Sequence, residues 1–411
     1  MKKKIMSLLA VPLALSLAAC STGGDEATDT GDAGDTETPA TTETVNLKVW
    51  GAQEEQDFLK ERVEAFKGEN PDTEFNIELG VVGEPDARDI VTQDLDAAAD
   101  VFAFANDQIT DLHEAGALYE ITKNKDELIA NNVEGSIEAA MVGDSLYAYP
   151  MTADNGYFMY YDSSVFSEDD VKSLDRMIEV AEEADRKVFF DVANGWYNAS
   201  FFLGAGNTIE IDENGTQKVD FNNEHGLKAG NFMRDFTASP AFIGGDDEVL
   251  TSQESIAAGV SGTWNAGAMQ DKFGENYAAT KLQTMNLDGE EMQMASFGGY
   301  KLMGVKTSTK HPLEAMALAE FLTNEESQIK RFEARELGPS NINAAGSDAV
   351  LENIALAALA EQSEFAVSQQ NVLGSFWEPA EAFGTAMLDG STEDMQTLLD
   401  EMVSQINTSN D

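Results

Sequence analysis

The chain has 411 residues, of which 75 are Asp or Glu and 25 are Lys or Arg, so its formal net charge at pH 7 is −50. This charge argues against nucleic acid, anionic lipid or a strongly anionic ligand as a partner, although a solvated acidic surface would also explain it. The length suffices for two ordinary domains, and 22 Phe suit a large core. The single cysteine, Cys20, excludes an intramolecular disulfide.

The first nineteen residues have the layout of a secretory signal. Lys2 to Lys4 precede an apolar run from Ile5 to Leu17, which is too short to span a bilayer comfortably. Leu17-Ala18-Ala19-Cys20 resembles the lipobox of bacterial lipoproteins. This resemblance implies cleavage after Ala19, a diacylglyceryl group on the Cys20 sulfur and stable attachment to the outer face of the cell membrane. The alternative is an ordinary secretory signal with a free thiol nearby.

Residues 20–44 form an acidic segment after the signal. From Ser21 to Thr44 the chain contains Thr, Asp, Gly, Ala and Glu but neither an aromatic nor a basic residue. Such a composition buries too little apolar surface to order itself. We therefore predict a disordered linker that holds a globular body, beginning at Val45, clear of the lipid surface.

Strands and helices alternate after Val45. Val45–Trp50, Glu74–Leu79 and Asp100–Phe104 have strand patterns, and the two segments between them have apolar residues at helical spacing. This order predicts an α/β protein with parallel strands, in which ligands bind beyond the carboxyl ends of the strands. Residues 50–54 and 106–108 occupy those ends.

The later segments continue this alternation less regularly. Tyr157–Tyr161 and Val188–Val192 are predicted strands, and residues 211–221 predict a hairpin around Asn214-Gly215. Leu313–Phe321 and Met395–Ile406 predict amphipathic helices.

Several motifs, taken in order, resemble the extracellular solute-binding proteins of ABC importers, in particular the carbohydrate-binding group that includes maltodextrin-binding protein. The resemblance extends from Val45 to Asp411. The motifs are Val49–Gly51, Asp100–Asp107, Leu112–Leu118, Tyr149–Asp154, Tyr160–Asp162, Gly259–Trp264, Leu313–Glu326, Leu337–Asn341 and Phe376–Glu378.

The resemblance implies a two-lobed periplasmic-binding-protein-like fold with a hinge and with lobes that are discontinuous in sequence. Residues 45–152 and 301–342 would form lobe 1, and residues 153–300 and 343–411 would form lobe 2. The chain would cross between the lobes near residues 150–154, 296–300 and 340–346. It also implies a monomer that needs no cofactor, performs no catalysis, binds an oligosaccharide between its lobes and delivers it to ABC transporter permease subunits.

Aromatic and polar residues at the expected cleft are the candidate ligand contacts. Aromatic faces cover the apolar faces of sugar rings, and carboxylates and amides bind their hydroxyl groups. The aromatic candidates are Trp196, Trp264, Trp377, Trp50 and Tyr197, and the polar candidates are Asp107, Asp154, Asn194, Glu54, Asn106 and Gln53. Each tryptophan can instead belong to the core, and each polar residue can instead cap a helix.

Some residues depart from the family pattern. Asn194 stands where maltodextrin binders use a Glu, and Asp107-Gln108 replaces the usual acidic and basic pair. These differences leave carbohydrate as the implied class of ligand, whereas the identity of the sugar does not follow from the sequence.

Other functions have weaker support. His113, His225 and His311 lack the spacing of metal ligands, Tyr160-Tyr161 lies in an apolar strand pattern, and Asp212–Gly215 lacks the closing Glu of a calcium loop. Nucleophile elbows, Walker loops and zinc motifs are absent from the sequence. A glycosidase carboxylate pair remains an alternative, because the chain has 75 acidic residues. A surface adhesin or scaffold is a further alternative, but it would predict sequence repeats or a single β-rich domain, and the sequence indicates neither.

Overall fold

The computed structural model describes residues 44–212 and 215–408. The predicted signal peptide, the lipidation of Cys20 and the linker up to residue 43 lie outside the described residues, as does Asn214 at the hairpin turn. Within the described ranges, every helix is too short or too polar to span a bilayer.

A six-stranded sheet contains the predicted N-terminal strands. Its order is β17-β16-β3-β1-β2, with β6 also paired to β16. Strand β1 lies parallel to β2 and β3, as the α/β pattern predicts, whereas β16 is antiparallel to β3 and β6. The strands are β1 (Val45–Gly51), β2 (Phe75–Val81), β3 (Val101–Ala105), β6 (Tyr149–Gly156), β16 (Ser296–Val305) and β17 (Ala366–Ser368).

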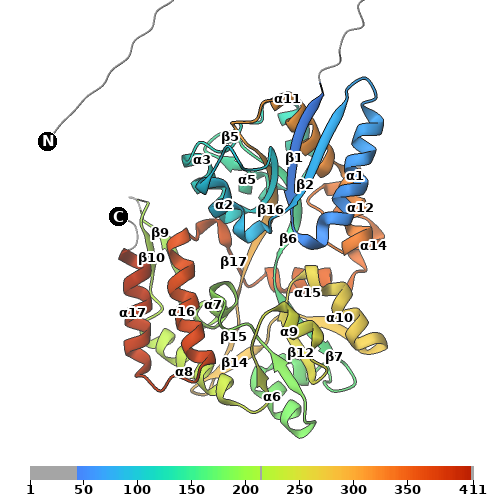
Figure 1. Ribbon diagram of the computed structural model, residues 1–411. Coiled ribbons are helices and arrows are strands. Elements are labelled where there is room, and N and C mark those ends of the chain that lie inside the picture. Colours follow the sequence, from blue (N-terminus) through green and yellow to red (C-terminus); the bar gives the residue numbers. More distant parts are fainter. Residues whose placement is uncertain (1–43, 213–214, 409–411) are drawn as a thin grey trace, which may run out of the picture. The chain divides into compact units, whose positions relative to one another are not determined.

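Helices with apolar faces cover this sheet. Helix α1 buries Phe58, Leu59, Val63 and Phe66, which recur at helical spacing, and Figure 1 shows it beside β1 and β2. These side chains join the strands in one apolar core. We call this sheet and its helices the first lobe. The helices are α1 (Gln56–Glu69), α2 (Ala87–Gln93), α3 (Ile109–Glu114), α4 (Lys125–Asn131), α5 (Glu134–Ala139), α11 (Pro312–Thr323) and α12 (Glu325–Arg335), and a small hairpin pairs β4 (Met141–Val142) with β5 (Ser145–Leu146).

A second sheet has the order β11-β8-β12-β7-β13. Strand β8 is parallel to β11 and β12, and β7 is antiparallel to β12 and β13. Strand β8 ends at Phe189, earlier than the predicted Val192, because Val192 N–H turns back to the carbonyl oxygen of Phe190 at 2.9 Å. The strands are β7 (Phe158–Asp162), β8 (Lys187–Phe189), β11 (Phe242–Ile243), β12 (Ile256–Ser261) and β13 (Tyr277–Thr280).

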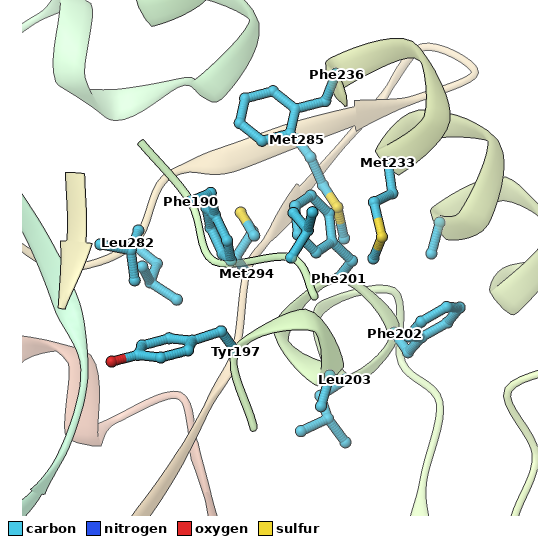
Figure 2. Close-up of a cluster of buried hydrophobic side chains, with 14 of the residues drawn as sticks. Phe190, Tyr197, Phe201, Phe202, Leu203, Met233, Phe236, Leu282, Met285 and Met294 are labelled. Atoms are coloured by element: carbon cyan, nitrogen blue, oxygen red, sulfur yellow. The ribbon is translucent and has the colours of Figure 1, made fainter. Parts of the chain in front are cut away.

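The second sheet packs on a core rich in Phe and Met. Figure 2 shows Phe190 and Phe201 in this cluster, with Met285 and Met294 beside them. We call this sheet and its helices the second lobe. The helices are α6 (Leu174–Glu183), α7 (Gly195–Gly204), α8 (Glu224–Ala238), α9 (Asp247–Ser252), α10 (Ala266–Phe273), α15 (Ile354–Ser363), α16 (Trp377–Leu388) and α17 (Met395–Thr408), and the hairpins pair β9 (Ile209–Ile211) with β10 (Gln217–Val219) and β14 (Thr284–Leu287) with β15 (Glu290–Gln293). Two short helices, α13 (Ile342–Ala345) and α14 (Asp348–Leu351), lie between α12 of the first lobe and α15 of the second.

Two long strands connect the sheets. Strand β6 leaves the first sheet at Gly156, and the chain enters β7 of the second sheet at Phe158. Strand β16 runs back from Ser296 into the first sheet. Strand β17, which the predicted boundaries assign to lobe 2, is hydrogen-bonded to β16 at the edge of the first sheet. The residue boundaries of the lobes stay predictions.

Candidate binding cleft

A cavity of about 870 Å³ is lined by residues from both lobes. Its volume lies in the usual range for small-molecule sites. On the first lobe it is lined by residues that follow β1, β2 and β3, which include Glu54, Glu84 and Asp107. On the second lobe Asp191 follows β8 and Trp264 follows β12. The cavity therefore lies at the carboxyl ends of the strands, where the sequence predicts the site.

Three partly exposed tryptophans lie on the second-lobe side of the cavity. The ring centroids of Trp196 and Trp264 are 5.9 Å apart, with 40° between the ring planes. Trp377, the first residue of α16, packs edge-on against Phe297 and Phe376. All three line the cavity, so each combines packing against the second core with a surface that a ligand can reach.

Hydrogen bonds hold two of these rings in place. The Trp264 indole Nε1–H donates to Asp247 Oδ2 at 3.1 Å. The Trp196 indole Nε1–H donates to Gln369 Oε1 at 2.9 Å. Asn194 caps α7 by accepting a hydrogen bond from Trp196 N–H at 3.0 Å. The two indole bonds fix the ring planes of Trp264 and Trp196 before any ligand arrives, which lowers the entropic cost of binding.

Carboxylates dominate the polar lining of the cavity. Burial raises the pKa of Asp107 to about 6 against the lowering effects of Gln369 and Arg88, and the charge of Asp111 makes a smaller contribution to the rise. Burial together with the negative charge of Asp247 also raises the pKa of Asp191 to about 6. The described lining residues include the carboxylates Glu54, Glu55, Glu84, Asp86, Asp89, Asp107, Asp191, Asp246, Asp247, Glu378 and Glu381, and the cations Arg88, Lys301 and Arg335.

Most of the predicted site residues come together around this cavity. Tyr197 lines the cavity but is only 6% exposed, and burial raises its pKa well above the ordinary value, so its ring belongs largely to the second core. The predicted residues that line the cavity are Trp196, Trp264, Trp377, Tyr197, Asp107, Asn194 and Glu54. Their roles as ligand contacts stay predictions.

The structure places Asp154, Asn106 and Trp50 away from the cavity lining. Asp154 is 1% exposed, and its Oδ2 accepts hydrogen bonds from Thr263 Oγ1 and Gly338 N–H. It therefore joins chain segments rather than facing solvent.

Asn106 and Trp50 also have structural contacts. Asn106 is 1% exposed, and its Oδ1 accepts a hydrogen bond from Tyr300 N–H at 2.9 Å. Gly299 makes this approach possible, because a Cβ there would lie 2.4 Å from Asn106 Oδ1. The Trp50 ring packs over Gly80 and against the first core. Gln53, at the exposed start of the short 3-10 helix Gln53–Glu55, is likewise outside the lining.

The structure adds residues that the sequence analysis missed. Lys301 in β16 is 9% exposed, lies 3.8 Å from Glu84 Oε1 and places Nζ 5.2 Å from the Trp264 ring centre. A lysine within an apolar strand pattern is a signal that could have identified it. Gln369 and Asp191 lack any comparable local signal. Among the described residues, groups of three or more His, Cys, Asp or Glu arranged to hold a metal are absent.

Comparison with known proteins identifies the family. Residues 61–358 match the family model described as bacterial extracellular solute-binding protein. The chain belongs to this family. The matched segment contains β2, β3 and most elements of both lobes, so the resemblance deduced from the sequence motifs and the two-lobed α/β fold class are confirmed.

Several known proteins are similar to nearly the whole chain. A galactooligosaccharide-binding protein of Bacillus subtilis (strain 168) is 27% identical over 97% of this chain and 95% of its own length. A structure solved with acarbose is 31% identical, with a TM-score of 0.82, and covers 89% of this chain and 99% of its own. The maltodextrin-binding protein MalE1 from L. casei BL23, solved without ligand, is 25% identical, with a TM-score of 0.74 over 89% of this chain and 100% of its own. The family is described as extracellular solute-binding proteins, and two of these relatives are named as sugar-binding proteins.

Proposed function

We propose that this protein captures an oligosaccharide, preferably a maltodextrin or related α-glucan, between its lobes and delivers it to an ABC transporter permease. The observation that supports this most strongly is the group formed by Trp196, Trp264 and Trp377 on one side of a cavity rich in carboxylates. Each tryptophan can stack on the apolar face of a sugar ring, while the carboxylates accept hydrogen bonds from hydroxyl groups.

The charge of the cavity supports a neutral sugar over an anionic one. Asp107 and Asp191 have pKa values of about 6, so both are mainly ionised above pH 7. An anionic sugar would add repulsion to carboxylates that already repel one another, whereas hydroxyl groups donate hydrogen bonds to them. We therefore do not expect uronic acids or sugar phosphates as ligands.

The relatives support two sugar classes. The acarbose complex and the maltodextrin-binding protein favour an α-glucan. The Bacillus subtilis relative favours a galactooligosaccharide as the second candidate. Asn194 caps α7 where maltodextrin binders use a Glu, so the α-glucan is bound without that carboxylate.

Binding would proceed by closure of the lobes. A sugar on the tryptophans of the second lobe would attract the first-lobe residues Asp107 and Glu54, and rotation at the connecting strands would bring the lobes together. The ligand shifts this equilibrium only by its greater affinity for the closed form. The anchor at Cys20 would keep the protein near a permease in the same membrane. Every step is a binding step, and no covalent bond forms or breaks.

A thermal-unfolding screen tests the ligand class. Purified protein is heated with maltose to maltoheptaose, acarbose, galactooligosaccharides, cellotriose and glucuronic acid. At a ligand concentration of about 100 times Kd, the native state gains about 2.7 kcal/mol, which raises Tm by several degrees. A shift with galactooligosaccharides alone would replace the α-glucan by the second candidate. Failure of every sugar to raise Tm would contradict the carbohydrate assignment.

Incubation with the sugar that binds separates this proposal from a hydrolase. We expect the oligosaccharide to remain intact for hours with the protein in excess. Reproducible release of shorter sugars, absent from a control with heat-unfolded protein, would contradict a binding-only function.

A further inference from the structure

One glutamine side chain joins the two sides of the cleft. Gln369 is 4% exposed, lines the cavity and lies in the short 3-10 helix Gln369–Asn371 directly after β17. Its Nε2 donates a hydrogen bond to Asp107 Oδ1 at 2.5 Å. Its Oε1 accepts hydrogen bonds from Trp196 Nε1 at 2.9 Å and from Asn155 Nδ2 at 3.0 Å. One amide therefore contacts a first-lobe carboxylate, a second-lobe indole and connecting strand β6.

The backbone holds Gln369 in this position from both directions. Before it, Val367 and Ser368 of β17 pair with β16 at the edge of the first sheet. After it, Leu373 N–H donates to Gln217 Oε1 at 2.8 Å, and the Gln217 amide donates to Ser375 Oγ at 3.3 Å. Gln217 is fully buried, so these bonds tie the segment firmly to the second lobe. The same segment then leads into α16 and Trp377.

The hydrogen-bond partners of Gln369 permit only one orientation of its side-chain amide. Trp196 Nε1 and Asn155 Nδ2 are both donors, so the Gln369 oxygen has to face them and the nitrogen has to face Asp107. A glutamate at this position could still accept the two donors. Its second oxygen, however, would face the Asp107 carboxylate and repel it.

We propose that Gln369 is a positioning residue of the cleft, whose single amide holds both the Asp107 carboxylate and the Trp196 ring in the arrangement that receives a sugar. This inference rests on the proposed function, since Asp107 and Trp196 are the ligand contacts that it serves. Gln369 sets the direction of an acceptor for hydroxyl groups and the plane of a stacking surface at the same time. A ligand then meets both contacts already oriented.

The swap of donor and acceptor between positions 107 and 369 tests this proposal. In the double variant Asp107→Asn/Gln369→Glu, the asparagine amide can donate to the glutamate, and the glutamate still accepts from Trp196 and Asn155. The total charge of the pair is unchanged. Affinity for maltotriose is measured by calorimetry at pH 8 for the wild type, both single variants and the double variant.

We expect Gln369→Glu to weaken binding at least tenfold in the wild-type background. In the Asp107→Asn background the same change should alter affinity less than threefold or improve it. Gln370→Glu is the matched control, because Gln370 lies outside the cavity lining and its Nε2 donates a long hydrogen bond of 3.5 Å to the Glu138 carbonyl oxygen. We expect its affinity to stay within threefold of the wild type. An equal loss from Gln369→Glu in both backgrounds would overturn the proposal.

Measurements on the ligand-free protein separate this proposal from the choice of ligand. Near-ultraviolet circular dichroism reports the environment of the tryptophan rings, and urea unfolding reports the repulsion between positions 107 and 369. We expect Gln369→Glu to change both, and the double variant to restore both. If maltotriose fails to bind the wild type while these signals show the restoration, the proposed ligand is wrong and the positioning role stands. If the double variant restores neither signal, Gln369 does not position Asp107 and Trp196.

Discussion

Lys301 Nζ lies 5.2 Å from the centre of the Trp264 ring. The same ammonium group lies 3.8 Å from Glu84 Oε1, which follows β2 of the first lobe. Lys301 therefore connects a first-lobe carboxylate to a second-lobe tryptophan, as Gln369 does for Asp107 and Trp196. The first connection uses a side chain of β16, and the second uses a side chain of the segment that follows β17.

We predict that Lys301→Met destabilises the protein by about 3 kcal/mol, because it leaves the Glu84 carboxylate, 5% exposed, without its cation. The double variant Lys301→Met/Glu84→Gln removes that unpaired charge and should recover most of the loss. Urea unfolding at pH 8 measures all three free energies of unfolding. Additive effects of the two substitutions would show that the pair is not coupled.

Trp50→Ala distinguishes the sequence prediction from the structure. Trp50 is predicted from the sequence to be a ligand contact, whereas its ring packs over Gly80 and against the first core. We expect a loss of about 3 kcal/mol in stability, with affinity for the sugar unchanged. Urea denaturation and calorimetric titration of the same preparation decide whether Trp50 is a core residue or a ligand contact. A large loss of affinity in a stably folded variant would restore Trp50 to the ligand contacts.

Asp191→Asn should stabilise the protein above pH 6. The raised pKa of about 6 means that the native state binds a proton more readily than the unfolded chain does. Stability is therefore lost as pH rises from about 4 to about 6, where the carboxyl group ionises in its buried position near Asp247. The neutral amide avoids that loss.

Urea unfolding at pH 4 and pH 8 measures this effect. The gain from Asp191→Asn should be larger at pH 8, and Asp235→Asn, which changes an exposed carboxylate of α8, serves as the control. An equal change at both pH values would show that ionisation of Asp191 does not oppose folding.

The strands were predictable because their patterns are local. Val45, Leu47 and Val49 alternate inward along β1, and the structure places β1 within one residue of the predicted range. Asp107 was predictable as a candidate for the cleft because it lies two residues after the buried strand β3, at the carboxyl end of the sheet. Trp264, three residues after β12, was predicted from the resemblance to the family.

The remaining site residues depend on partners that are distant in sequence. Asp154 was expected to face the cleft, but its carboxylate bonds Gly338, which is 184 residues away. Gln369 bonds Asp107 across 262 residues. Nothing in the local composition distinguishes a polar side chain that faces solvent from one that bonds a distant backbone group. Only the tertiary arrangement decides between them.

The membrane anchor requires its own experiment, because Cys20 lies outside the described residues. We predict that Cys20→Ser leaves the protein in the medium or as an unprocessed precursor, since the sole cysteine follows Leu-Ala-Ala. Detergent-phase partitioning of extracts from cells that express the wild type or the variant measures whether the protein carries a lipid. Unchanged partitioning of the variant would exclude lipidation at Cys20.

The central claim is that the tryptophans of the cleft bind a sugar. Calorimetric titration of maltotriose into the wild type, Trp264→Ala and Trp377→Ala tests it most directly, with urea unfolding of each protein as the check on folding. We predict saturable binding to the wild type and a loss of about 1–3 kcal/mol of binding free energy in each variant, by analogy with other rings that stack on aromatic side chains. Unchanged affinity in both variants, together with a loss of about 3–5 kcal/mol in stability, would show that these tryptophans belong to the core and do not bind the sugar.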